Sequence, residues 1–379
     1  MRLTLKCNSL QAQEQNQAQE AVPPVLPSVA VSAENQAPVC CKSVHAARTA
    51  RPSRRALSVP SVSCLSAPQA RALDEQLGLV NWEVWPENCH KWTLPTPSGN
   101  ISGVSLLADS FSGIQDDDTL ARESVLLLPG LTGSKEDFLY LLPLLAAEGY
   151  DVHSFDLPGQ FESAGAVPPG TVGYDWHFFE AALVAVLEKI GYAHVLGLSF
   201  AGLLAEKVAL SRPNLVRSLS LMSTPPKTGN GFSRVKFLGF LSRVATPRMI
   251  ANLMMGAIYL NVIPVDRARL RFVRRRMHYH VFCSVTDTLR LMLHIPADLR
   301  QVKNLPQPKL LLVGEHDLWR VADFRKFARE IGASMRVYQA GHSPCETVPH
   351  QVARDLVEFY RKTASRNPVK EVGGAAVTS

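Results

Sequence analysis

Residues 194–202, HVLGLSFAG, place one serine directly after a continuous apolar run and in front of a segment with helical spacing. A short apolar run of this kind is typical of a strand that is buried on both faces. The following segment, FAGLLAEKVALSRP, stops before Pro213, as a helix would. Ser199 is therefore predicted at a sharp turn from a strand into a helix, where the small residues Gly197 and Ala201 let the two elements approach closely.

Similar apolar runs recur along the chain and define the fold class. A hairpin-like pair of strands is predicted first, with its turn at residues 97–100. Further strands are predicted within residues 124–130, 150–156, 216–226, 308–314 and 334–340, and helical spacing fills most intervals between them. Strands that alternate with helices predict an α/β fold with a mostly parallel, doubly wound sheet. The carboxyl ends of its strands should meet at one edge, where ligands bind in such sheets.

The predicted turn gives Ser199 a chemical interpretation. A sharp bend at this point forces the serine into a strained backbone conformation and lifts its hydroxyl above the sheet edge. The N–H of Phe200, at the start of the helix, would then point to where an oxyanion forms. The alternative is an ordinary strand–helix turn with an incidental serine.

Two further residues stand at predicted strand ends in the order that a catalytic triad on one sheet requires. Asp317 follows the run PKLLLVG, and His342 follows SMRVYQA. A serine hydroxyl needs an imidazole to accept its proton, and the imidazole needs a carboxylate to fix its tautomer. Alternatively, Asp317 caps the next helix and His342 is a surface turn residue. Because all three residues fall at carboxyl ends of strands, Ser199, Asp317 and His342 are favoured as a triad.

The loop after the run at residues 124–130 supplies a fourth feature. Its Gly130-Leu131 pair would place the Leu131 N–H as a second oxyanion donor beside that of Phe200. With these motifs the chain resembles the α/β-hydrolase family over residues 92–360. Pro129 stands where that family usually has a histidine, which affects the side chains of the loop but not its backbone donor.

The chain divides into three parts. Residues 1–75 are rich in Gln, Ala, Pro, Ser and Arg, with few aromatic residues, and are expected to form a disordered tail. Residues 76–365 are expected to form the hydrolase domain, and residues 366–379 a flexible tail. The resemblance implies that an insertion at about residues 226–300 forms a helical cap over the active site.

The cap concentrates positive charge. Residues 226–300 contain thirteen Lys and Arg against three Asp and Glu, a net charge of +10, whereas the whole chain carries +7. A solvated helix face is favoured, in which long side chains cover apolar surface. Attraction to acidic substrates or contact with an anionic membrane surface is the less favoured alternative. No motif that reads nucleic acid accompanies the arginines, so nucleic-acid binding is not expected.

Several other classes are excluded by what the sequence does not contain. The seven cysteines form no CxxC and no spaced Cys/His cluster, so neither a zinc site nor a disulfide framework is expected. This usage fits a reducing compartment and favours a cytoplasmic location over export by an atypical N-terminal signal. No run of about 18 apolar residues is present, so no membrane-spanning helix is expected. No phosphate-binding glycine loop is found, and no metal or cofactor is expected.

These features together predict a serine hydrolase that cleaves a small or medium ester with a hydrophobic portion, through an acyl-enzyme. The apolar residues of the cap favour such a small-molecule substrate. Amide, thioester or carbon–carbon bond hydrolysis on the same fold stays open, as does a non-catalytic ligand-binding protein. The sequence does not indicate an oligomeric state.

Overall fold

The computed structural model describes residues 61–86, 88–108, 122–170, 173–233, 235, 245–260 and 265–366. Its centre is an eight-stranded sheet with the strand order β1-β2-β4-β3-β5-β6-β7-β8. The strands are β1 (His90–Thr96), β2 (Gly99–Leu106), β3 (Ser124–Leu128), β4 (Asp151–Phe155), β5 (Ala193–Leu198), β6 (Val216–Met222), β7 (Lys309–Gly314) and β8 (Ser334–Tyr338). β1 pairs antiparallel with β2, and β2 with β4, whereas all other pairs are parallel. The predicted hairpin and the predicted mostly parallel sheet are confirmed.

The strand order reverses beside β3. The chain passes from β3 to β4 on one side and then crosses back to β5 on the other side. Such a reversal opens a crevice between the loops at the carboxyl ends of the two diverging strands. These are the loops that contain Leu131, after β3, and Ser199, after β5.

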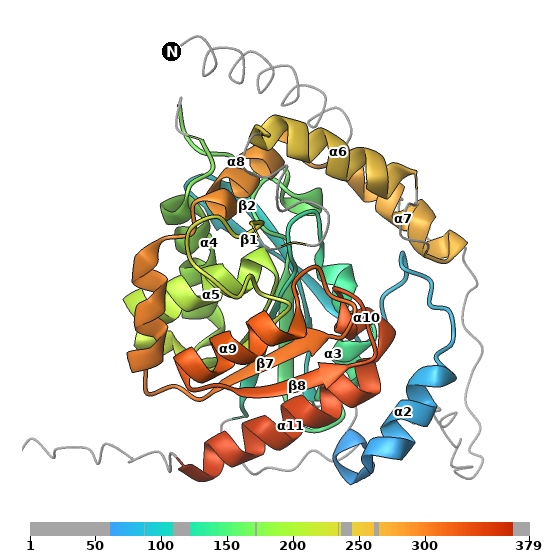
Figure 1. The fold of residues 1–379 in the computed structure, drawn as a ribbon. Helices are drawn as coiled ribbons and strands as arrows, with labels where there is room; N and C mark the ends of the chain where they lie inside the picture. The colour runs from blue at the N-terminus through green and yellow to red at the C-terminus, as the bar shows by residue number, and fades with distance from the viewer. Residues whose placement is uncertain are drawn as a thin grey trace, which may run out of the picture.

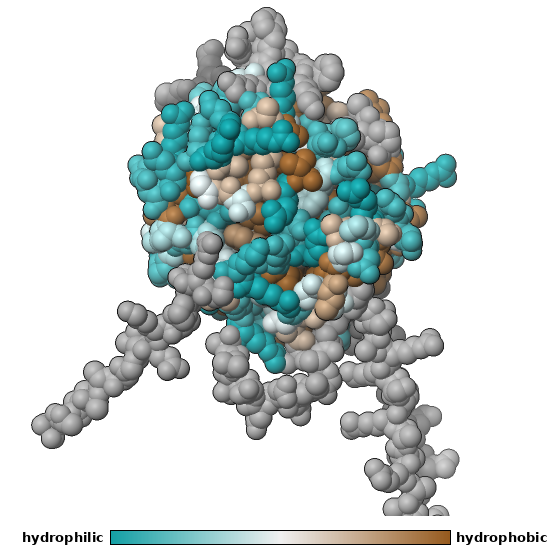
Figure 2. Space-filling view, turned by 60° about the horizontal axis from the view of Figure 1, so that its bottom comes forward, coloured by the Kyte–Doolittle hydropathy of each residue, from teal (hydrophilic) through white to brown (hydrophobic). Residues whose placement is uncertain are grey.

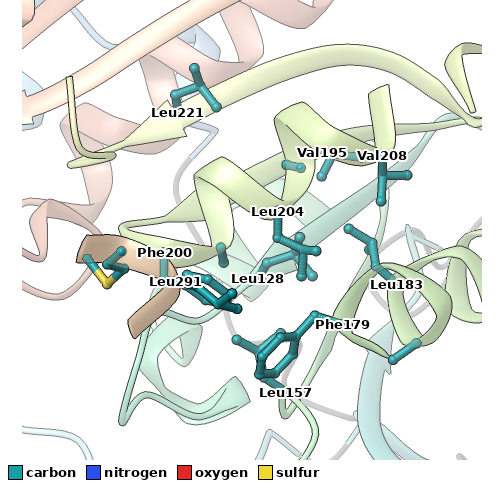
Figure 3. Close-up of a cluster of buried hydrophobic side chains, with 14 of the residues drawn as sticks. Leu128, Leu157, Phe179, Leu183, Val195, Phe200, Leu204, Val208, Leu221 and Leu291 are labelled. Carbon is teal, nitrogen blue, oxygen red and sulfur yellow. The ribbon is translucent and has the colours of Figure 1, made fainter. Parts of the chain in front are cut away.

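Helices cover both faces of the sheet, because the strands alternate the direction of their apolar side chains. In β3, Val125 and Leu127 belong to one buried cluster and Leu126 and Leu128 to the other. The first cluster is closed by α3 (Leu141–Ala146) and α11 (Pro349–Arg366), and the second by α4 (Trp176–Ile190), α5 (Phe200–Ser211) and α9 (Val321–Ile331). Figure 3 shows this second cluster, in which α5 presents Phe200, Leu204 and Val208. The doubly wound arrangement is visible in Figure 1.

Short helical segments occupy the loops between these elements. They are η3 (Lys135–Phe138), η4 (Phe161–Ser163), η5 (Pro213–Leu215) and α10 (Pro344–Thr347). Among the cysteines of the described residues, Cys64, Cys89 and Cys345 are free thiols. Cys283 is in a disulfide.

The folded domain begins earlier than the sequence predicts. Residues 61–75 were expected in a disordered tail, and this expectation is wrong, because they form η1 (Val62–Cys64) and α2 (Ala67–Glu75). Val62 and Ala70 are fully buried. The Asp74 carboxylate accepts hydrogen bonds from the backbone N–H groups of His350 (2.8 Å) and Gln351 (3.1 Å), at the start of α11. Asp74 is therefore an N-terminal cap for a helix that lies far away in the sequence. Residues 1–60 and 367–379 lie outside the described residues.

Truncation experiments can separate the contribution of residues 1–60 to stability from that of η1 and α2. A chain that begins at Ser61 is expected to keep the melting temperature of the full chain. A chain that begins at Gln76 should melt on the order of 5 °C lower, because it loses the helix cap and two buried side chains. Equal melting temperatures for the two truncated chains, measured by circular dichroism, would show that η1 and α2 do not stabilise the domain.

The cap consists of helices inserted between β6 and β7. They are α6 (Pro247–Tyr259), α7 (Arg267–Met277), α8 (Phe282–Leu293) and η7 (Ala297–Asn304). Figure 1 shows α6, α7 and α8 together at the top of the molecule. Ser284 of α8 donates to the Pro158 carbonyl in the loop after β4 (3.0 Å), and Arg269 of α7 contacts the loop after β3. The cap thus packs on the carboxyl edge of the sheet. None of the helices in the described ranges is long and apolar enough to cross a membrane.

Candidate active site

Ser199 occupies a strained turn between β5 and α5. Its backbone angles are φ 55° and ψ −119°, a region that residues with a side chain rarely adopt. Its N–H donates to the Met222 carbonyl at the end of β6 (2.8 Å), which holds the turn against the neighbouring strand. The residue is 7% exposed. The geometry is that of a serine raised above the sheet edge at the start of a helix.

Crowding around this turn explains the small residues beside the serine. A Cβ atom on Gly197 would lie 2.4 Å from the Ala201 carbonyl oxygen. A Cβ atom on Gly202 would lie only 1.8 Å from Thr224 Oγ1, just after β6. Ala201 is fully buried without such a clash. Close approach of α5 to β6 therefore requires glycine at position 202, whereas alanine fits at position 201.

Asp317 and His342 come from the loops after β7 and β8, and the structure brings them together. The His342 Nδ1–H donates to Asp317 Oδ1 (2.8 Å). The Asp317 side chain is fully buried, whereas that of His342 is 30% exposed. The Leu318 N–H also donates to Asp317 Oδ1 (2.5 Å), which fixes the carboxylate. In the neutral imidazole, this hydrogen bond favours the tautomer whose Nε2 is the acceptor.

Ser199 and His342 lie at the same sheet edge but are not bonded to each other. Within the described residues, no hydrogen bond joins Ser199 Oγ to His342. Catalytic hydrogen bonds are often formed only once a substrate is bound. The arrangement can therefore perform acyl transfer only if this contact forms in the substrate complex.

The two predicted oxyanion donors are available. Gly130 packs against the turn, since a Cβ atom on it would lie 3.3 Å from Ser199 Cβ. In the described part of the chain, neither the Leu131 N–H nor the Phe200 N–H donates to another backbone group. Phe200 is the first residue of α5, where N–H groups have no partner within the helix. Two free amides thus flank the serine.

Backbone strain is concentrated at this edge of the sheet. The four non-glycine residues with positive φ in the described ranges are Thr132 (61°), Phe161 (42°), Ser199 (55°) and Ser223 (50°). They lie in the loops after β3, β4, β5 and β6, respectively. Such strain persists only where the surrounding structure imposes it, and it is common at functional sites.

His280, between α7 and α8, braces two of these strained residues. The Phe161 N–H donates to His280 Nδ1 (3.0 Å), and the His280 Nε2–H donates to the Thr132 carbonyl (3.3 Å). Burial, together with the nearby Arg276, lowers the pKa of His280 to about 3. The imidazole is therefore neutral at physiological pH and acts as one donor and one acceptor. Sequence analysis did not identify this residue.

Two arginines of α7 also join the cap to the active-site loops. Arg269 Nη2 donates to Asp137 in η3 (2.8 Å) and to Glu346 in α10 (2.7 Å). Arg276 Nη1 donates to the same Asp137 carboxylate and to Ser134 Oγ (3.1 Å). Both arginines are nearly fully buried. The expectation that the cap arginines form a solvated face is wrong for these two.

A cavity of about 540 Å³ lies beside α5 and is not lined by the candidate catalytic residues. Leu203 and Glu206 of α5, Leu299 of η7 and Phe327 of α9 are among its lining residues, which do not include Ser199, Asp317 or His342. Burial raises the pKa of Glu206 well above its ordinary value. The cavity is therefore separate from the candidate active site. In the part of the chain that the structure describes, no group of His, Cys, Asp and Glu could hold a metal ion.

Comparisons with known proteins agree with the fold described above. Residues 125–355 match the model of the alpha/beta hydrolase family. No curated protein matches the chain. Among solved structures, the fold is similar to that of a carboxylesterase from the thaumarchaeon Nitrososphaera gargenis (18% identity, TM-score 0.57, 73% of this chain and 100% of that one). It is also similar to that of a haloalkane dehalogenase from Bradyrhizobium elkanii (18% identity, TM-score 0.57, 74% of this chain and 98% of that one). A third similar structure is an enol-lactonase from Burkholderia xenovorans (17% identity, TM-score 0.53, 71% of this chain and 100% of that one).

At these identities the solved structures support the fold alone. The family model spans more than half of the chain, from β3 to α11. The chain belongs to the α/β-hydrolase family.

Proposed function

We propose that the protein is a serine hydrolase that cleaves a small or medium ester with a hydrophobic portion. Ser199 Oγ attacks the acyl carbon while His342 Nε2 accepts its proton. His342 then returns that proton to the leaving alcohol, and water releases the acyl group by the same route. Asp317 orients His342 and stabilises its cation. The N–H groups of Leu131 and Phe200 stabilise the oxyanion.

The strained turn at Ser199 beside the Asp317–His342 pair is the observation that supports this proposal most strongly. A positive φ of 55° at the end of a central strand is strained for a serine, and here it occurs at the start of a helix. A buried carboxylate that holds a partly exposed imidazole at the same edge supplies the matching base. A hydrophobic substrate is supported by Leu131, which packs against the same apolar cluster as Phe200 and Leu291 of the cap.

Other reactions on this fold are alternatives. Amide, thioester or carbon–carbon bond hydrolysis would use the same serine and the same oxyanion donors. The similar structures include carboxylesterases, an enol-lactonase and a haloalkane dehalogenase. Dehalogenation is disfavoured here, because that chemistry needs a carboxylate where Ser199 stands. A non-catalytic ligand receptor is disfavoured because it would not need the Asp317–His342 pair.

A chain-length series of p-nitrophenyl esters, combined with a fluorophosphonate probe, tests the proposal. The probe should label Ser199 specifically, and turnover should rise from acetyl to a medium acyl chain as apolar contact increases. Labelling without ester turnover, together with amide or thioester cleavage, would favour the alternative reactions. Absence of labelling in a folded protein would favour a receptor.

His280 is expected to act as a positioning residue for the oxyanion loop. The change His280→Gln should lower kcat for esters by about tenfold or more, with a smaller effect on KM, because Thr132 and the adjacent Leu131 lose their brace. Steady-state kinetics on a soluble ester would measure both parameters. Since His280 is neutral near pH 7, the pH profile of the remaining activity should keep its shape.

His153 provides a matched control. It is also a buried histidine, with its pKa lowered by burial to about 4, but it lies within β4 and contacts Ser105. His153→Gln should reduce thermal stability without lowering kcat. If both variants lowered kcat equally, the effect of His280 would be general destabilisation and not loop positioning.

A further inference from the structure

Helix α6 has apolar residues on its exposed side, beside Arg248 and Asn252, as well as on its buried side. Its sequence, PRMIANLMMGAIY, contains a single charged residue, Arg248. Only Ile250 and Ala251 are buried in the helix. Large apolar side chains that gather on the exposed side of a helix mark an interaction surface or a side that faces a membrane. The outer side of α6 therefore calls for an apolar or interfacial environment.

The exposed apolar residues of α6 form one continuous face. Met249 is 56% exposed, Leu253 53% and Leu260 74%. These residues are four and seven positions apart, so they lie on the same side of the helix. Tyr259 (57%) and Val265 (43%) extend the face towards α7.

This grouping of exposed apolar side chains is unusual for the molecule. The other large apolar side chains that are exposed in the described residues belong to other segments of the chain, namely Leu79, Val84, Tyr192 and Val337. Figure 1 places α6 at the outer edge of the molecule. Figure 2 shows a face turned forward from the bottom of that view, in which hydrophilic side chains predominate and hydrophobic ones form small groups.

Positive charge surrounds the apolar face. Arg248, Arg267 and Arg271 are exposed. Arg274 donates to the Tyr259 carbonyl (2.6 Å) and lies over the Tyr259 ring, which joins the end of α6 to α7. The one acidic residue of the two helices and their caps, Asp266, is held by the N–H groups of Ala268 and Arg269 as the N-cap of α7. The surface is therefore apolar in its centre and basic at its margin.

We propose that this docking face (Met249, Leu253, Tyr259 and Leu260, with Arg248, Arg267 and Arg271) binds an anionic lipid membrane. Leucine and methionine side chains would enter the boundary between headgroups and acyl chains, while arginines pair with lipid phosphates. A second copy of the chain is disfavoured as the partner, because two such faces would bring like charges together.

Docking in this manner would orient the active site. The opposite side of α7 holds the loops after β3 and β8 through Arg269 and Arg276, so α6 and α7 lie between the membrane and the carboxyl edge of the sheet. If the proposed hydrolase function holds, the natural substrate is an ester drawn from the membrane. This consequence rests on the proposed function, whereas the docking itself does not.

Vesicle sedimentation tests the docking on the full chain. The Ser199→Ala protein is mixed with vesicles of phosphatidylcholine alone or with added phosphatidylglycerol, at two salt concentrations. We expect strong binding only with phosphatidylglycerol, reduced by salt. Leu253→Ser with Leu260→Ser should weaken binding by about tenfold. Arg267→Gln with Arg271→Gln should weaken it by about tenfold as well, mainly at low salt.

Matched variants outside the cap control for both changes. Leu79→Ser removes a leucine that is at least as exposed as Leu253 and Leu260, and Arg325→Gln with Arg329→Gln removes two exposed charges from α9. Neither should alter binding. Thermal melting checks that every variant is folded, and the single change Leu253→Gln replaces the double variant if that one fails to fold.

The outcomes separate docking from catalysis. Equal vesicle binding by the wild-type and Ser199→Ala proteins would support docking whatever the fate of the hydrolase proposal. Absence of binding to anionic vesicles would overturn the docking proposal even if esters are cleaved. A dimer in light scattering that Leu253→Ser with Leu260→Ser converts to a monomer, without vesicle binding, would assign the face to a second copy instead.

Discussion

Replacing Ser199 with alanine is expected to abolish fluorophosphonate labelling and to lower ester turnover by about 10³-fold or more. The proposed mechanism has no second nucleophile, so His342 and the two amide donors would act on water alone. Residual activity from the oxyanion donors should stay well below that of the intact site. Turnover of a p-nitrophenyl ester and labelling measured on the same preparation would test this.

Ser223 offers a matched control for this change. It is also a buried serine with positive φ, and it follows the adjacent strand β6. Within the described residues its Oγ has no hydrogen-bond partner. Ser223→Ala should retain labelling and most of the turnover. Retained turnover in a folded Ser199→Ala protein would refute Ser199 as the nucleophile.

The sheet could be predicted from the sequence because buried parallel strands need continuous apolar runs. Every residue of β5 and of β7 is buried, and both runs stand out between segments of helical spacing. Once parallel strands are predicted, the carboxyl edge follows, and with it the common location of Ser199, Asp317 and His342. The contact between Asp317 and His342 depends on β7 and β8 being neighbours, which the sequence alone did not establish.

The contacts between the cap and the loops could not be predicted in the same way. Charged residues on a helix are assigned to its solvated side unless their partners are known. Arg269, Phe272 and Arg276 are three and four residues apart and form the buried stripe of α7. This spacing is a signal that could have been recognised, but the partner Asp137 lies 132 residues before Arg269 in the sequence.

The N-terminal boundary was missed for a related reason. Low apolar content predicts that a segment cannot form a core of its own, but it does not exclude packing on an existing one. Val62 and Ala70 add two small apolar contacts, and Asp74 caps α11 from a distance. Such a contribution becomes apparent only when the position of α11 is known.

Replacing Asp137 with asparagine is expected to cause the largest loss of stability among single changes in the cap contacts. Burial alone would raise the pKa of Asp137, but Arg276 and Arg269 outweigh it and hold the pKa below its ordinary value. The carboxylate is therefore charged, and its removal leaves Arg276 buried with Ser134 as its remaining hydrogen-bond partner in the described residues. Breaking a buried ion pair in this way costs about 3–5 kcal/mol, or on the order of 10 °C in melting temperature.

The pair between Arg275 and Glu83 is the matched control, because it also joins α7 to the body of the domain but is about half exposed at both ends. Glu83→Gln should cost well under about 1 kcal/mol of stability.

The pH dependence of the Asp137→Asn effect gives a second test. A carboxylate with a lowered pKa stabilises the fold above its unfolded pKa and loses that effect as the pH falls through its folded pKa. The difference between wild type and Asp137→Asn in chemical denaturation should therefore shrink in acid. Adding Arg276→Met to Asp137→Asn should restore part of the stability, since the unpaired charge is then absent. Equal losses for Asp137→Asn and Glu83→Gln would mean that the buried network does not hold the cap to the active-site loops.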